Sequence, residues 1–276
     1  MPVIVVAVDR PPDDRPPLAD VVVEAGGASV DDVLRTIDRN PIASTALALL
    51  LRGAGERALG DGLVAESAVY SMLQSGPEFA AWRARTPVKQ RAPDTQPAVR
   101  IERDGERLAL VIDRPHVRNA LNVAVRDGLL SGLGLAAADD SIRDVVIRGE
   151  GPSFCSGGDL DEFGSFEDPA SAHVVRLVAS IGRAIDALGP RVRVEVHGAC
   201  AGSGVELPAF APRVLARPDF TAALPEVTLG LVPGAGGTVS VARRIGRHRT
   251  ALLALSGTAI DAATGLRWGL VDDIGD

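Results

Sequence analysis

The fold is decided by the stretch HGACAGSGVELPAFAPRVLARPDFTAALPEVTLGLVPGAGGT, residues 197–238. It contains two glycine-rich turns and two glutamates, Glu206 and Glu226. Glu206 heads an apolar run, so we expect it in the first turn of a buried helix, and Glu226 follows a proline at the end of a strand-like run. Two carboxylates beside closely approaching backbone indicate acid–base chemistry next to an anion-stabilising loop. A single such glutamate is more often a helix N-terminal acid or a solvated turn residue.

The composition is that of an ordinary globular protein. Apolar residues make up 46% and charged residues 24% of the 276 residues, enough for one large core or two modest ones. The net charge of −7 argues against nonspecific binding to nucleic acid or to an anionic membrane surface. Cys155 and Cys200 lie in small-residue runs, as expected of reduced thiols, and no Cys/His spacing fits a metal site. With no signal peptide and no apolar run of membrane-spanning length, we expect a cytoplasmic protein.

The chain divides into three parts. Residues 1–85 read mainly as helices, residues 86–97 form a polar linker, and residues 98–276 alternate between helix and strand. The alternation favours an α/β fold whose strands are buried on both faces. In the first part, Ser29 and Asn40 are expected to cap successive helices.

Two motifs precede the opening stretch, and a third forms its end. In DRPHVRNALN (113–122), Asn122 is expected to cap the next helix, and Arg118 is either a phosphate contact or a surface charge. In FCSGGDL (154–160), small residues let a ligand approach the backbone, whose amides can bind an anion. The turn PGAGGT (233–238) enters a helix but lacks the lysine of a phosphate-binding Walker loop. Each motif alone is weak evidence for a site.

Taken together, these motifs resemble the crotonase superfamily, the enoyl-CoA hydratase/isomerase family. The resemblance lies in RPHVRNALN (114–122), FCSGGDL (154–160), HGACAGSGVEL (197–207), LPEVTLGLVPGAGGT (224–238) and LSGTAIDAATGLRWGLVD (255–272). It implies an α/β fold, a ClpP/crotonase-like spiral of ββα units with an additional, mainly helical N-terminal region. It also implies binding of acyl-coenzyme A thioesters, with the thioester carbonyl held in an oxyanion hole.

Carried over by position, the resemblance implies a role for each candidate site residue. The catalytic residues would be Glu206 and Glu226, and the oxyanion hole would use the amides of Gly158 and Ser203. Coenzyme A would contact Arg118 and Ala120 on its phosphate and pantetheine side, and Ser156, Asp159 and Leu160 on its adenine side. No separate cofactor or metal is implied, since coenzyme A arrives as part of the substrate. The family also implies a homotrimer or hexamer.

Two glutamates favour a hydratase. Adding water across a conjugated thioester requires one carboxylate to polarise the water and one carboxyl to deliver a proton to the α-carbon. By the family's usual division, Glu206 activates the water and Glu226 delivers the proton, whereas simple double-bond isomerases usually keep only the second glutamate. An isomerase, a thioester hydrolase, a decarboxylase and a non-catalytic acyl-CoA-binding relative stay open as alternatives.

The sequence departs from the family pattern at its ends. The family normally continues beyond the position of residues 269–272 with a helical segment that closes the acyl pocket and builds a trimer. This sequence reaches Asp276, and residues 1–97 precede the core. Residues 20–82 loosely resemble the helical segment. They suggest a circular permutation that relocates the cap to the N-terminus, with an unrelated helical domain as the alternative.

Overall fold

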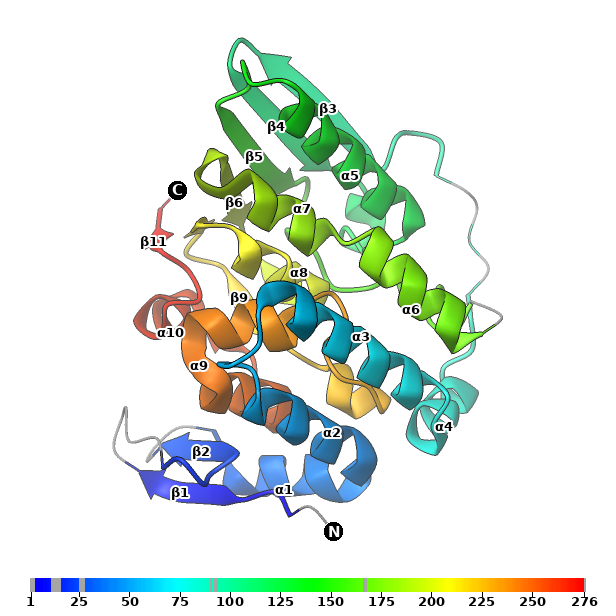
Figure 1. Cartoon of the computed structure of the whole chain (residues 1–276), viewed down its shortest axis with the longest axis vertical. Helices are drawn as coiled ribbons and strands as arrows, with labels where there is room; N and C mark the ends of the chain where they lie inside the picture. Colours follow the sequence, from blue (N-terminus) through cyan, green and yellow to red (C-terminus); the bar gives the residue numbers. More distant parts are fainter. Residues whose placement is uncertain are drawn as a thin grey trace.

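The C-terminal part is built on a six-stranded sheet, which lies toward the top of the view in Figure 1. The computed structural model describes residues 3–10, 16–24, 28–89, 91, 94–165 and 168–275. The strand order is β11-β8-β6-β5-β4-β3, parallel except for the β3–β4 hairpin. The strands are β3 (Val99–Asp104), β4 (Arg107–Ile112), β5 (Asp144–Gly149), β6 (Val192–Val196), β8 (Arg213–Ala216) and β11 (Asp273–Ile274). Three successive residues of β5, Val145 to Ile147, are buried, so both faces of the sheet are covered there as predicted.

A second, three-stranded sheet brings the two glutamates together. Its order is β10-β9-β7, formed by β7 (Ala199–Ala201), β9 (Thr221–Ala223) and β10 (Ile260–Asp261). Strands β7 and β9 are parallel, with Ala201 opposite Ala223. Because the carboxyl ends of parallel strands meet at one edge, the segments that follow them, which carry Glu206 and Glu226, start side by side.

Helices cover the sheets of the C-terminal part. They are α5 (Val123–Ala138), α6 (Pro169–Val178), α7 (Ile181–Leu188), α8 (Ser203–Glu206), α9 (Gly237–Ser256) and α10 (Ala262–Trp268). Helix α5 packs on β3, β4 and α7. Its N-terminus is capped by Asn122, which accepts a hydrogen bond from the Val125 amide at 2.9 Å, so that prediction is confirmed. Throughout the described ranges, no helix has both the length and the apolar character needed to cross a bilayer.

The N-terminal part packs directly against the C-terminal part (Figure 1). It contains β1 (Val6–Arg10), β2 (Val21–Glu24), α1 (Val30–Arg39), α2 (Pro41–Arg52), α3 (Leu59–Gln74) and α4 (Pro77–Arg85). Helices α1 and α2 contact α9, and α3 contacts both α6 and α9. Buried residues such as Leu47 and Leu51 belong to the same hydrophobic core as the main sheet. The N-terminal helices therefore cover the C-terminal part and do not form a core of their own.

The structure places Ser29 and Asn40 at the predicted N-cap positions of α1 and α2, but the expected side-chain caps are not made. Neither Ser29 before α1 nor Asn40 before α2 accepts a hydrogen bond through its side chain. At α2 the carboxylate of Glu78, from the first turn of α4, accepts from the amides of Ile42 and Ala43 at 2.7 and 2.9 Å. A carboxylate offers two oxygens and a full negative charge to the positive end of the helix, so it replaces the neutral asparagine.

The described residues of the predicted linker lie along the FCSGGDL segment. Arg91 pairs with Asp159 at 3.3 Å and with Asp161 at 2.9 Å. Asp94 accepts a hydrogen bond from Arg114 at 2.6 Å. These ion pairs join the linker to the loops that follow β4 and β5, close to the two glycine-rich turns.

Candidate active site

One cavity gathers most of the residues that sequence motifs single out. It has a volume of about 210 Å³. Its lining includes Gly158, Asp159, Ser203, Glu206 and Glu226. These residues come from the loop after β5, from helix α8 and from the turn after β9, so three distant motifs meet at one place.

Glu206 ends helix α8 and is held by the PGAGGT turn. Its side-chain Oε2 accepts hydrogen bonds from the amides of Ala235 and Gly237, both at 2.8 Å. The hydroxyl of Ser240 donates to its backbone carbonyl at 2.7 Å. Burial raises the pKa of Glu206 to about 7, while the two amides oppose that rise. Near neutral pH the carboxyl can therefore either take up or release a proton.

Glu226 begins the short 3-10 helix Glu226–Leu229 and is also buried. Within the described part of the chain, its Oε2 has no hydrogen-bond partner. Burial, with the negative charges of Glu206 and Glu66, raises the pKa of Glu226 well above its usual range. Its surroundings thus favour the protonated form, and its unpaired oxygen is available to a ligand.

Only glycine fits at position 202, directly before α8. Its backbone φ is +49°, and a Cβ at this position would lie 2.3 Å from Oε1 of Glu226. Gly204 is equally tight, because a Cβ there would lie 2.0 Å from the carbonyl oxygen of Cys155. The two glycines allow the turn after β7 to approach both the FCSGGDL segment and Glu226.

The amides of Gly158 and Ser203 are candidates for an oxyanion hole. Among the described residues, neither amide donates to a protein acceptor. A parallel bridge between Leu121 and Gly158 fixes the loop, with the Leu121 amide donating to Gly157 at 2.8 Å. Two uncommitted amides on a cavity that also holds two carboxyls fit the stabilisation of a thioester oxyanion.

The five residues expected at coenzyme A differ in accessibility. Asp159 is buried and lies 3.4 Å from Arg114, which also donates to the carbonyl of Ala120 at 2.7 Å. Asp159 and the carbonyl of Ala120 are therefore both already bound to the guanidinium of Arg114. The other three lie nearer the surface and comprise exposed Arg118, half-buried Ser156 and exposed Leu160.

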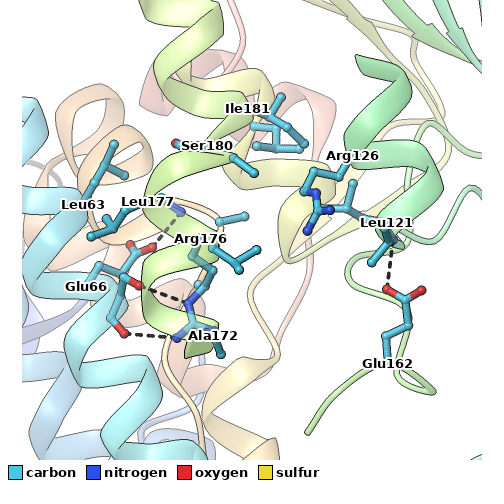
Figure 2. A pocket seen from close by; sticks show the side chains of 18 of the residues that line it. Leu63, Glu66, Leu121, Arg126, Glu162, Ala172, Arg176, Leu177, Ser180 and Ile181 are labelled. Carbon is cyan, nitrogen blue, oxygen red and sulfur yellow. Dashed lines mark hydrogen bonds between the residues drawn. The ribbon is translucent and has the colours of Figure 1, made fainter. Parts of the chain in front are cut away.

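A second cavity of about 200 Å³ adjoins the first and shares part of its lining, including Leu121, Arg176 and Ala235. Figure 2 shows Glu66 from α3 and Arg176 from α6 on one side of it, and Arg126 and Glu162 on the other. This adjoining space could receive the part of a ligand that extends past the two glutamates.

Three residues of this region were not predicted from the motifs. Glu66 and Tyr70 come from α3, and Arg176 comes from α6. The Arg176 guanidinium donates to the Ser67 hydroxyl at 3.1 Å and lies 4.7 Å from the centre of the Tyr70 ring. One feature of the sequence could have pointed to Glu66. This residue lies on the same face of its helix as Leu63, and an acid on an apolar face is rarely buried without a partner.

Comparison with known proteins gives matches over the C-terminal two thirds of the chain. The profile of the enoyl-CoA hydratase/isomerase family matches residues 106–275. A 2,3-dehydroadipyl-CoA hydratase of Escherichia coli (strain K12) is 34% identical over 174 residues, which cover 63% of this chain and 68% of that protein. A trans-2-decenoyl acyl-carrier-protein isomerase of Streptococcus mutans is 30% identical over 166 residues, 59% of this chain and 63% of that protein.

Solved structures match over the same part. The crystal structure of an enoyl-CoA hydratase from Thermoplasma volcanium GSS1 has a TM-score of 0.61 and 35% sequence identity. The match covers 66% of this chain and 73% of that one. Since the similar proteins include both hydratases and an isomerase, likeness alone does not choose between the two reactions.

Proposed function

Because the chain belongs to the enoyl-CoA hydratase/isomerase family, we propose that it is an enoyl-CoA hydratase that adds water across the double bond of a 2-enoyl-CoA thioester. One observation carries this proposal: two buried carboxyls, Glu206 and Glu226, line one cavity together with two uncommitted amides. Both carboxyls have raised pKa values, which suits proton transfer near neutral pH.

In the proposed reaction the thioester oxygen accepts hydrogen bonds from the amides of Gly158 and Ser203, which draw electrons away from the β-carbon. Ionised Glu206 takes a proton from water as the water oxygen bonds to the β-carbon. Protonated Glu226 gives its proton to the α-carbon, and the double bond becomes a single bond. Return of a proton from Glu206 to Glu226 restores the starting state, so the net change is the addition of one water.

The test uses crotonyl-CoA with the wild type, Glu206→Gln and Glu226→Gln. A hydratase gives a product heavier by one water, and each substitution lowers turnover by about 10²–10⁴-fold, the usual contribution of a general acid or base. Glu56→Gln changes an exposed glutamate of the same charge and serves as the control. Full activity in either active-site variant would contradict the proposed division of roles.

A double-bond isomerase is the second candidate. One observation favours it: Oε2 of Glu206 is occupied by two loop amides, whereas Oε2 of Glu226 has no partner in the described chain. Glu226 alone could then carry a proton from one carbon to another. A 3-enoyl-CoA would be converted without change of mass, and activity would depend chiefly on Glu226. The same mass measurement identifies a thioester hydrolase by the release of free coenzyme A and a decarboxylase by the loss of carbon dioxide. A non-catalytic relative would bind acyl-CoA in a separate binding assay but give no product.

The N-terminal helices are proposed to serve as the helical cap of this site, in a permuted position. Support comes from α3, which contributes Tyr70 to the first cavity and Glu66 to the second and packs on α6 and α9. Binding of a non-reactive acyl-CoA analogue should slow amide exchange in residues 59–85 as well as in residues 154–160. Protection confined to residues 154–160 would favour an unrelated helical domain. A trimeric or hexameric assembly stays a prediction, which light scattering tests.

A further inference from the structure

Four consecutive amides at the start of α9 are shared between two carboxylates. The backbone amides of Ala235 and Gly237 donate to the carboxyl of Glu206, both at 2.8 Å. The backbone amides of Gly236 and Thr238 donate to the carboxyl of Glu66, at 2.7 and 2.8 Å. One loop is therefore held from two sides, by a side chain of α8 and by a side chain of α3.

Both carboxyl oxygens of Glu66 accept hydrogen bonds from the start of α9. It is 2% exposed, and its three hydrogen-bond partners are two backbone amides and the Thr238 hydroxyl, which donates at 2.7 Å. Burying such a group is costly unless its hydrogen bonds are made, and these bonds fix the position of the loop in return. Without Glu66, the same loop amides would be buried without an acceptor.

We propose that Glu66 is a positioning residue for the reaction: it fixes the loop of residues 235–238 and, through that loop, the carboxylate of Glu206. The inference rests on the proposed function, in which Glu206 activates water. It assigns an active-site task to helix α3, which lies outside the residues matched by the family profile.

Glu66 also acts on Glu226 through its charge. Of the residues that the structure describes, six charged or titratable groups line the cavity with Glu226 or act on it electrostatically: Glu206 from α8, Glu66 and Tyr70 from α3, Arg176 from α6, and Asp159 and Glu162 from the loop after β5. Burial and the charge of Glu206 raise the pKa of Glu66 to about 8, so above that pH Glu66 is ionised and raises the pKa of Glu226. If Glu226 must be protonated to donate, activity falls at alkaline pH, and loss of Glu66 moves that fall to lower pH.

The variant Glu66→Gln keeps the shape of the side chain but places an NH₂ group against one of the loop donors. We expect kcat to fall about ten- to hundredfold, since a buried loop donor left without an acceptor carries that much, with KM changing less than about threefold. The alkaline limb of the pH profile should move to lower pH. Thr238→Val removes only the hydroxyl bond and should show a smaller fall. Asp61→Asn, an exposed acid on the same helix, should behave as the wild type.

A second measurement does not depend on turnover. Amide hydrogen exchange in Glu66→Gln should speed up at all four positions of residues 235–238, because the loop moves as a unit and releases Glu206. Faster exchange at Gly236 and Thr238 alone, or a wild-type kcat and pH profile, would overturn the inference. A wild type that turns over no 2-enoyl-CoA would count against the proposed function only, and the exchange pattern would still decide the role of Glu66.

Discussion

Replacing Glu206 by glutamine removes an ionisable group from a buried position and leaves its loop contacts in place. The side-chain oxygen of glutamine can accept from the same two amides that now donate to Oε2. Burial raises the pKa of this carboxyl from 4.5 to about 7 in the folded protein. The folded state therefore binds the proton more tightly than the unfolded state does, and stability falls as the pH rises from 4.5 through about 7.

The difference between the two pKa values corresponds to about 3 kcal/mol of unfolding free energy, lost by about pH 8. This value is a ceiling, because Glu206 interacts electrostatically with two other buried carboxyls that titrate with it, Glu66 and Glu226. Glu206→Gln has no such loss. We expect it to match the wild type at about pH 5 and to exceed it by up to about 3 kcal/mol at about pH 8.5.

Urea unfolding at both pH values measures the effect, with Glu56→Gln as the exposed control. The slope of free energy against urea should be the same for all three proteins. A stability difference that is equal at both pH values would refute the reasoning, because it would trace the effect to packing. The reasoning would also be refuted if the wild type became more stable relative to Glu206→Gln as the pH rises.

Three other substitutions test single features of the structure. Gly202→Ala should lower kcat and the urea midpoint, because the positive φ costs about 1–3 kcal/mol and the new Cβ would displace the Glu226 carboxylate. Asn119→Ala should cost about 2–4 kcal/mol in urea unfolding, since the side chain bonds the backbone of Arg114 in its own turn and of Glu150 and Ser153 in the loop after β5. Glu78→Gln should lower the melting temperature through a loss of about 1 kcal/mol, because the amide can accept from only one of the two α2 amides.

The regular elements and the meeting of the motifs could be predicted from the sequence. Helix α5 begins directly after the predicted cap Asn122, and helices and strands alternate after residue 98 as predicted. Both predictions rest on strong local signals, an apolar pattern bounded by a cap or a turn. The joint approach of Glu206 and Glu226 was implied by the family resemblance of the combined motifs, and the parallel pairing of β7 with β9 accounts for it in the structure.

Contacts between distant segments could not be predicted. Asn40 has the residue type of a cap, but the carboxylate of Glu78 reaches the same amides from another helix. Asp159 was expected near adenine, and its ion pairs with Arg91 and Arg114 depend on how the linker lies against the core. Glu66 has no local partner, so only the folded chain shows why an acid is buried there.

The bonds of Glu66 to the start of α9 join positions 170 and 172 residues apart. At a typical synthesis rate of about 5–20 residues per second, α3 leaves the ribosome about ten seconds or more before its partner amides exist. During that interval α2 and α3 can pack on each other and on neighbouring helices, but the apolar surface that α9 will cover stays exposed. The nascent chain should therefore depend on chaperones at this stage, and fragments that end before residue 235 should aggregate even though they contain every N-terminal helix.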